Sequence, residues 1–322
     1  MNLTPRLRAA FLVAATMLGA ASAHAATPTR VGDLDAPTRP AGVPADYVVT
    51  PNGFFHASCV VELAEGDRVA ATGDVVHADG SVRKAAACAF PRFGRDGQVI
   101  DAGTDAAPPT INGWVVDSNS NSGATPPSAK SVADFVVPSG PSSAGSQVLY
   151  FFPGLESAPN VQSILQPVLA WNGFGDGAWT VTNWNCCISG TTYHGSTIPT
   201  ATGHTIHGVM KGSSCSTSSG VCTNWKIVST DKQTSQSTTF NTQAHGQAMN
   251  WYFGGVMEVY GVSTCSQYPS NGSITFSNIH FYDLSLHDST PSNWNKDIGN
   301  VSPSCSYGLT ATTNKTVITF NP

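Results

Sequence analysis

From residue 110 onward, the chain alternates short apolar runs with segments rich in Ser, Thr, Gly and Asn. The runs are rich in β-branched and aromatic residues, and none has the 3.6-residue period of an amphipathic helix. Many short strands separated by turn residues predict an all-β fold, a two-sheet antiparallel β-sandwich of the concanavalin A-like or jelly-roll type. We expect strands at residues 114–117, 132–137, 148–152, 164–171, 179–184, 205–210, 225–229, 238–240, 251–262, 274–282 and 317–320.

Two of these runs carry one polar residue inside an otherwise apolar strand. Alternation along residues 163–171 places Gln166 on one of two apolar faces. In residues 251–262, Glu258 is the one carboxylate. A strand that is apolar on both faces is normally covered on both sides, so a lone amide or carboxylate there must find partners or line a cavity. We therefore expect Gln166 and Glu258 to lie on adjacent strands and to share one site.

The first 25 residues have the features of a secretory signal peptide. Arg6 and Arg8 precede a short apolar segment, and Ala23-His24-Ala25 fits a small-residue cleavage site. The apolar segment is too short to span a bilayer, and no later stretch is long enough. We expect an exported protein, secreted or periplasmic in transit, and a monomer.

Residues 26–109 differ in composition from the rest of the chain. They carry 11 of the 20 acidic residues and alternate β-like runs with turns such as Asp79-Gly80. We expect a propeptide or small accessory β-rich domain, joined by a Pro-containing linker to the sandwich domain at 110–322. If it is a propeptide, acid would protonate its carboxylates and loosen its docking.

Charge and cysteine usage limit the partners and the compartment. Without the signal peptide, the net charge is more negative than the −5 of the whole chain, which gives no reason to expect nucleic acid or an anionic membrane. The few charges after residue 110 suggest tolerance of acid, because few ion pairs can be lost there. Eight cysteines in an exported chain predict disulfides. Cys59 with Cys88, Cys215 with Cys222, and Cys265 with Cys305 are plausible pairs, while Cys186 and Cys187 could form a vicinal bridge or pair elsewhere.

Several short motifs between residues 111 and 285 are informative through their order and spacing. They are Asn112-Gly113-Trp114, the strand 133–139 followed by a Gly/Ser/Ala turn, Phe152-Pro153-Gly154-Leu155-Glu156, Ile164-Leu165-Gln166, and the strand with Glu258. In this order and spacing the region resembles the glutamic peptidases of the eqolisin family, which are secreted acid endopeptidases with a two-sheet β-sandwich. The resemblance implies that Gln166 and Glu258 are the catalytic pair and that a polypeptide is the substrate.

The chain also departs from the family pattern. The acids of the family's Tyr-Asp-Ala-Trp-Tyr-Glu-Trp strand are absent from residues 179–184, and the first glutamate of its Ala-Glu-Phe-Ile-Ile-Glu-Asp-Phe strand is replaced by Gly255. More distantly, the chain is similar to the neprosin-like glutamic peptidases, in which both members of the pair are glutamates.

The two residue types suit peptide hydrolysis without a metal or a cofactor, and we expect neither. A carboxylate can take a proton from water and return it to the leaving nitrogen, which is the role implied for Glu258. A carboxamide NH₂ can donate to the oxyanion, which is the role implied for Gln166. Glu156 is expected to support the pair by orienting it or the water. Each residue also has a purely structural interpretation, as a bonded amide, a buried acid or a solvated loop charge.

Two other functions are compatible with the sequence. The first is a lectin-like carbohydrate-binding sandwich, which would use exposed Trp, Asn and Ser. The second is a polysaccharide-cleaving enzyme that uses Glu156 and Glu258 as a carboxylate pair. His194, His204 and His207 could suggest a metal site, but on a strand His204 and His207 face opposite sides, so surface histidines are the simpler interpretation.

Overall fold

The computed structural model describes residues 39–100, 113–121, 125–159, 161–187 and 190–322. The expected signal peptide and most of the linker before the sandwich lie outside these residues, as does Asn112. The described chain is built from strands in three sheets, with short 3₁₀ turns at η2 (Ala57–Cys59) and η4 (Cys265–Gln267). No helix among the described residues is long and apolar enough to cross a membrane.

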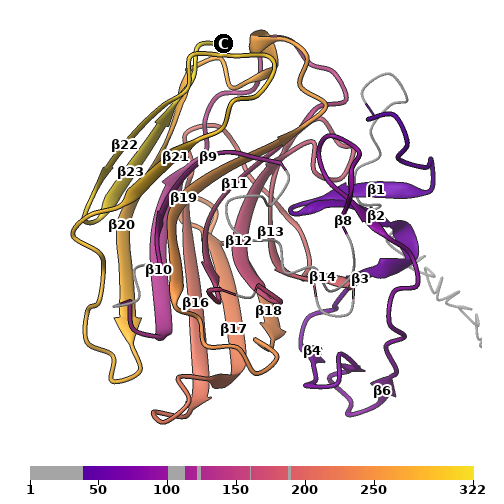
Figure 1. Cartoon of the computed structure of the whole chain (residues 1–322), viewed down its shortest axis with the longest axis vertical. Helices are drawn as coiled ribbons and strands as arrows, with labels where there is room; N and C mark the ends of the chain where they lie inside the picture. The colour runs from indigo at the N-terminus through magenta and orange to yellow at the C-terminus, as the bar shows by residue number, and fades with distance from the viewer. Residues whose placement is uncertain (1–38, 101–112, 122–124, 160, 188–189) are drawn as a thin grey trace, which may run out of the picture.

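A ten-stranded sheet forms one layer of a β-sandwich (Figure 1). Its central strands pair antiparallel, with β10 lying between β16 and β20. In spatial order the sheet contains β22 (Gly308–Thr312), β23 (Lys315–Thr319), β20 (Ser273–Asp283), β10 (Ser128–Val136), β16 (Thr205–Cys215), β17 (Cys222–Asp231), β18 (Ser237–Thr242), β4 (Arg68–Val69), β5 (Val75–Val76) and β6 (Val82–Arg83).

A nine-stranded sheet forms the other layer and contains both strands with an isolated polar residue. Eight strands lie in the order β21 (Asn295–Ile298), β9 (Trp114–Ser120), β19 (Trp251–Tyr260), β11 (Val148–Glu156), β12 (Ile164–Trp171), β13 (Trp179–Cys186), β14 (Thr192–His194) and β3 (Val60–Glu62), and β15 (Ile198–Pro199) pairs with β13. Between the two sheets lies an apolar core that includes Phe135, Phe151, Leu169, Ile227 and Phe276. The predicted all-β sandwich is confirmed.

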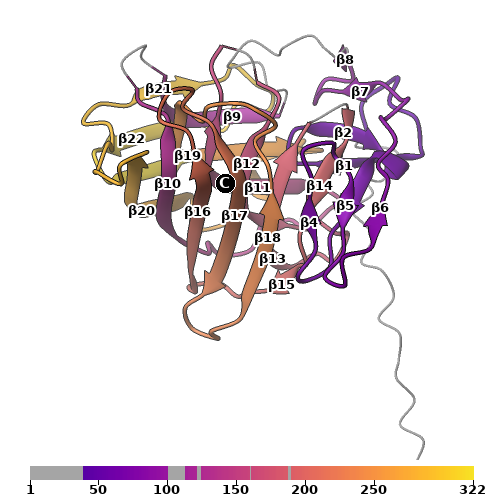
Figure 2. The same ribbon diagram turned by 90° about the horizontal axis from the view of Figure 1, so that it is seen from below.

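The N-terminal residues 39–100, which we call the N-terminal unit, lie against one side of this sandwich (Figures 1 and 2). Four of its strands form a separate small sheet in the order β1 (Tyr47–Thr50), β2 (Gly53–His56), β7 (Arg92–Phe93) and β8 (Val99–Ile100). Its other strands extend the sandwich, because β3 pairs in parallel with β14 and β4 pairs in parallel with β18. The unit is thus more closely joined to the sandwich than its composition predicted.

A second apolar core lies between the N-terminal unit and the outer face of the nine-stranded sheet. The unit contributes Val48, Val49 and Phe54, and the sheet contributes residues such as Phe152 and Trp184. Each of β11, β12, β13 and β19 is buried along nearly its whole length. These strands are therefore covered on both faces, as predicted for β12 and β19, whose sequences are apolar on both faces.

Four disulfides staple the described chain. They join Cys59 to Cys88, Cys186 to Cys187, Cys215 to Cys222 and Cys265 to Cys305. The three plausible pairs from the sequence are confirmed, and the adjacent cysteines form the vicinal bridge.

Candidate active site

Gln166 and Glu258 lie on the same face of the nine-stranded sheet, the outer one. Tyr150 on β11 pairs with Glu258 on one side and with Ala170 on the other, so all three share a face. Ala170 and Gln166 are four residues apart on β12 and therefore point the same way. The expectation of adjacent strands was wrong, because β11 lies between β12 and β19. Apolar periodicity sets the face of a strand but not the order of strands in the sheet.

Glu258 is completely buried and its carboxylate accepts three hydrogen bonds. The Tyr260 hydroxyl and the backbone N–H of Asn52 both donate to Oε1, the latter over 2.7 Å. The Trp114 indole Nε1–H donates to Oε2 over 3.1 Å. Burial raises the pKa of Glu258 to about 8, although the three donors and the charge of Arg92 act to lower it. With the N-terminal unit in place, Glu258 is therefore largely protonated at neutral pH.

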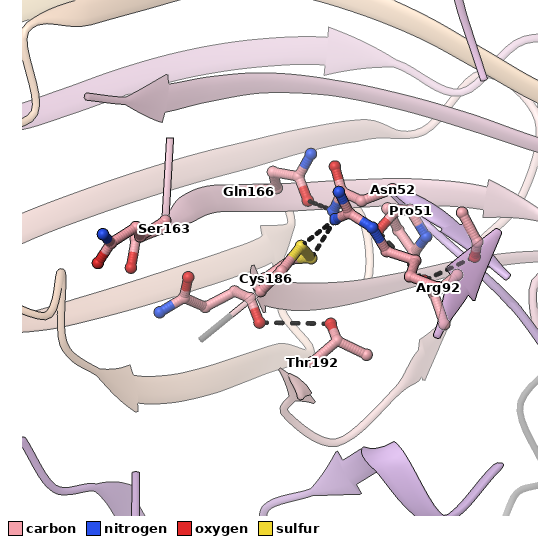
Figure 3. Close-up of a disulfide and its surroundings, with 12 residues drawn as sticks. Pro51, Asn52, Arg92, Ser163, Gln166, Cys186 and Thr192 are labelled. Carbon is pink, nitrogen blue, oxygen red and sulfur yellow. Dashed lines mark hydrogen bonds between the residues drawn. A yellow bond between two sulfur atoms is a disulfide. The ribbon is translucent and has the colours of Figure 1, made fainter. Parts of the chain in front are cut away.

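Gln166 is also completely buried. It is contacted by Asn52, the residue whose backbone N–H donates to Glu258. Its Oε1 accepts a hydrogen bond of 3.2 Å from the Asn52 side-chain Nδ2 (Figure 3). Its Nε2 has no hydrogen-bond partner among the described residues. The amide group that could donate to an oxyanion is thus the part of Gln166 that the fold leaves unused.

Asn52 is at the tip of the hairpin formed by β1 and β2 and connects the two candidate residues. It is fully buried and has a positive φ of 100°, which Asn tolerates better than most residues. Gly53 follows with φ +120°, and a Cβ there would lie 2.5 Å from the Phe93 carbonyl oxygen. The tip therefore has a specific conformation that brings one backbone amide and one carboxamide to the pair. The sequence analysis missed this residue, because 206 positions separate Asn52 from Glu258.

Glu156 ends β11 on the same face, opposite Ile164 of β12 and Trp251 of β19. It is fully buried, and neither carboxyl oxygen has a hydrogen-bond partner among the described residues. Burial, followed by the nearby charges of Asp117 and Glu258, raises the pKa of Glu156 well above its ordinary value. The interpretation of Glu156 as a solvated loop charge was therefore wrong.

Asp117 is a further buried acid that the sequence analysis did not single out. It lies on β9 opposite Val256 of β19, and burial raises its pKa to about 7. Asn119 donates a 2.7 Å hydrogen bond to it. Asp117 begins the polar run Asp117-Ser118-Asn119-Ser120, so nothing in the local sequence pattern indicated its burial.

Arg92 of the N-terminal unit lies beside the vicinal disulfide at the end of β13 (Figure 3). Its Nη1 lies 2.6 Å from the Cys187 sulfur and 3.6 Å from the Cys186 sulfur. Its guanidinium carbon lies 5.7 Å from the centre of the Phe55 ring. This contact is a second point at which a side chain of the unit enters the region around Gln166.

The three histidines do not form a cluster. His207 pairs with Asp134 and His204 with Asp231, each at 2.7 Å. His194 is buried against the Trp184 ring, with 4.5 Å between ring centroids, so the interpretation of His194 as a surface histidine was wrong. Burial lowers the pKa of His194 to about 4. Across the described residues, no group of three or more His, Cys, Asp or Glu side chains could hold a metal ion.

The contacts link Gln166 with Glu258 more closely than Glu156 with Glu258. Asn52 contacts both Gln166 and Glu258, whereas Glu156 and Glu258 are not opposite each other, because Glu258 pairs with Tyr150 and Glu156 with Trp251. None of the seven tryptophans is exposed while the N-terminal unit is in place, and Trp184 and Trp251 lie in the core beneath that unit. The family's first strand glutamate is replaced by Gly255 in this chain. The structure leaves no room for a side chain there, since a Cβ at Gly255 would lie 2.5 Å from the Phe276 ring.

The comparison with solved structures returns glutamic peptidases. A scytalido-glutamic peptidase with a transition state analog inhibitor matches at 13% identity and a TM-score of 0.43, covering 65% of this chain and 97% of that one. SCP-B, a member of the eqolisin family in complex with the tripeptide Ala-Ile-His, matches at 14% identity and 0.42, covering 65% and 96%. Aspergilloglutamic peptidase from Aspergillus niger matches at 16% and 0.40, covering 54% and 98%.

No protein-family model and no curated protein sequence matches the chain. The family that the sequence motifs resemble is thus the family that the structural comparison returns. The likeness in sequence and in superposition is loose.

Proposed function

We propose that this protein is a secreted, acid-active endopeptidase that hydrolyses peptide bonds with Gln166, Glu258 and an activated water. The observation that carries the proposal is the way Asn52 is bound. Its backbone N–H contacts Glu258 over 2.7 Å while its carboxamide contacts Gln166 over 3.2 Å. The two candidate residues thus bind the two amide groups of Asn52. The backbone nitrogen of Asn52, at Glu258, occupies the position that the leaving nitrogen of a substrate would need.

The proposed reaction uses one proton carrier and one oxyanion donor. Ionised Glu258 takes a proton from water as the water oxygen bonds to the carbonyl carbon of the substrate. The carbonyl oxygen becomes an oxyanion, to which the Gln166 Nε2–H donates. When the tetrahedral intermediate collapses, the C–N bond breaks and Glu258 returns the proton to the nitrogen. The products are a carboxylic acid and an amine, and Glu258 is ionised again.

The N-terminal unit is proposed to keep this site latent as a propeptide. Asn52 occupies the space between Gln166 and Glu258, and the apolar contacts of Val48, Val49 and Phe54 exclude water from it. The cover also raises the pKa of Glu258 through burial, so that in acid the covered carboxyl is protonated and cannot act as a base. Release of the unit would expose the carboxyl to water and lower its pKa towards the ordinary value.

The ion pairs of the N-terminal unit do not fit the expectation that acid loosens its docking on the sandwich by protonating the unit's carboxylates. The unit's own ion pairs join Asp46 to His56, Asp67 to His77 and Asp74 to Lys84, all within residues 39–100. Their protonation would loosen the unit itself more than its contact with the sandwich. Of the groups buried under the cover, carboxyls with raised pKa favour the closed form in acid, whereas His194 opposes it.

Glu156 is proposed to support the pair as a neutral carboxylic acid. Its raised pKa keeps it protonated in the acidic range, where it can donate a hydrogen bond towards a bound chain. The contribution is one of orientation, since the described structure gives it no bond to Gln166 or Glu258.

The test is a digest of a denatured protein substrate between pH 2 and pH 7, with the products sequenced. Wild-type protein incubated in acid should generate new amino and carboxyl termini at internal peptide bonds, and Glu258→Gln should generate none. Melting curves on both proteins establish that the variant is folded. A folded Glu258→Gln protein with wild-type cleavage would falsify the assignment.

A further inference from the structure

Tyr260 shares the outer face of β19 with Glu258, two residues further along the strand. Its ring is completely buried, and its hydroxyl donates to Glu258 Oε1. The Phe54 ring lies 5.4 Å away and the Tyr150 ring 6.2 Å away, both measured between centroids and both close to perpendicular. In the covered protein these contacts restrict the phenol to one orientation, with its oxygen at the carboxylate. The Tyr150 contact belongs to the sandwich and remains when the N-terminal unit, which carries Phe54, is removed.

Gly113, the residue just before β9, leaves room for this pair of groups by having no side chain. Gly113 has φ +133°, and a Cβ there would lie 2.8 Å from Glu258 Oε1 and would collide with the Tyr260 hydroxyl. The Val259 N–H donates to the Gly113 carbonyl over 2.9 Å, which holds the glycine against this part of β19. Any larger residue at 113 would have to displace the hydroxyl, the carboxylate or both.

The three donors to Glu258 differ in what happens when the cover leaves. The Asn52 N–H belongs to the N-terminal unit and departs with it, whereas Tyr260 and Trp114 belong to the sandwich and remain. Oε2 then keeps the indole, and Oε1 keeps the phenol. The position vacated by the Asn52 nitrogen, 2.7 Å from Oε1, is where a water or a leaving nitrogen can reach the base.

We propose that Tyr260 is a positioning residue for the general base: its hydroxyl occupies one acceptor site of Glu258 Oε1 and so directs the other towards the reacting atoms. The inference rests on the proposed function. It adds a residue that the pattern of catalytic Gln and Glu does not contain, since the family strand quoted above has Phe at this place.

The charge states agree with this role. Burial, followed by the neighbouring Glu258, raises the pKa of Tyr260 well above its ordinary value, so the phenol stays an O–H donor throughout the acidic and neutral range. A donor bonded to the carboxylate favours the ionised form and acts to lower the pKa of Glu258. Tyr260 thus keeps Glu258 available as a base at lower pH than burial alone would allow.

The experiment compares Tyr260→Phe with Tyr150→Phe in acid-incubated protein. Tyr150 is an equally buried phenol on the same face, but its hydroxyl donates over 3.4 Å to the Val49 carbonyl of the N-terminal unit and not to Glu258. Tyr260→Phe should lower kcat/KM about tenfold to a hundredfold, mainly in kcat, and move the acidic limb of the pH profile up by about one pH unit. Tyr150→Phe should leave the position of that limb unchanged.

Two measurements separate a positioning role from a structural one. A fall in activity of Tyr260→Phe with an unmoved acidic limb would overturn the inference, as would an equal shift in both variants. Incorporation of 3-fluorotyrosine at position 260 keeps the shape and strengthens the donor, so the limb should move to lower pH, and an unmoved limb again contradicts the proposal. An inactive wild type, or an active Glu258→Gln, would instead refute the proposed function.

Discussion

The two faces of the nine-stranded sheet are both buried, but their polar groups bond to different parts of the molecule. On the inner face, the Asn183 amide donates to the carbonyls of Ile227 and Thr238 and accepts from the Ser229 hydroxyl, and the Asn185 amide donates to Thr242 and Gln243. These bonds join the two sheets of the sandwich permanently. On the outer face, Glu258 accepts one of its three hydrogen bonds from the N-terminal hairpin, the Gln166 Oε1 accepts from the same hairpin, and the Glu156 carboxyl has no partner among the described residues.

The difference fits the proposed function, in which the inner face stabilises the sandwich and the outer face carries the catalytic residues. Glu156 has no bonded oxygen among the described residues, and Gln166 has an unused NH₂ group. Burying such groups without partners destabilises a protein by about 1–3 kcal/mol each. A fold that keeps them under a separate unit can use them once that unit is removed. The predictions below test this contrast.

Replacing the base should produce the largest effect. Glu258→Gln keeps the size of the side chain but removes the proton acceptor, so cleavage should fall by about 10⁴-fold. The same change should stabilise the covered protein at alkaline pH. Because the pKa of Glu258 is raised to about 8 in the folded protein, its burial is unfavourable above the ordinary pKa and most so above pH 8. Melting temperatures at pH 5 and pH 9 measure this: the gain over wild type should be larger at pH 9.

Removing the oxyanion donor should have the next largest effect on activity. Gln166→Ala should lower turnover by about 10²–10³-fold while Glu258 remains in place. Gln166→Glu adds an ionisable group near Glu258, so the two should titrate as a coupled pair and the pH profile should change shape. Asn183→Ala, an amide on the inner face, is the control: it should lower the melting temperature without a change in the pH profile. Full activity of folded Gln166→Ala would exclude the oxyanion role.

His194 should make the covered form less stable in acid. Its pKa in the folded protein is about 4, below the ordinary 6.5, so stability is fully present above pH 6.5 and is lost as the pH falls towards 4. The loss amounts to about 3 kcal/mol. His194→Gln should remove this part of the pH dependence, which urea unfolding at pH 7 and pH 4 measures. His204→Gln, at a partly exposed histidine, is the control, and an equal effect of both variants would contradict the prediction.

Disturbing the hairpin tip should have the smallest of these effects. Gly53→Ala places a Cβ 2.5 Å from the Phe93 carbonyl, at a residue with φ +120°, so the tip must shift away from Gln166 and Glu258. Strain of this kind is of order 1–3 kcal/mol, and the latent activity of the uncleaved chain should rise by about tenfold. Gly80→Ala is the matched control, because Gly80 also has a positive φ but has nothing within 4 Å of its added Cβ. Equal activity of the two variants would argue against the proposal that the hairpin tip blocks the site.

The parts of the site that lie within one strand could be predicted from the sequence, and those that depend on contacts between distant segments could not. An isolated Gln166 or Glu258 in an apolar run is visible because burial on both faces makes a lone polar group unusual. Nothing near Asn52 indicates its contact with Glu258, since the Pro51-Asn52-Gly53 sequence is typical of an ordinary hairpin turn. His194 follows the polar Thr191 and Thr192, so its burial depends on aromatic side chains from other strands.

The same distinction applies to the fold. The apolar strands β12 and β19 were predicted, because they have no polar alternation, whereas β11 was predicted only over residues 148–152, since Pro153-Gly154 is typical of a turn. The strands β21 (Asn295–Ile298) and β22 (Gly308–Thr312) were missed, since they form the edges of their sheets and are mostly exposed or half-buried. Edge strands carry little apolar pattern and are defined mainly by the partner to which they bond.

The central claim is that the N-terminal unit covers an active site on the outer face of the sheet. The direct measurement is a time course at acidic pH in which mass spectrometry follows the fraction of intact chains and a denatured-protein assay follows cleavage in the same samples. The account predicts that cleavage rises in proportion to the loss of residues 26–109 and that Glu258→Gln stays inactive when added wild-type enzyme shortens it. A full rate of cleavage by the intact chain, or no cleavage by the folded shortened chain, would contradict it.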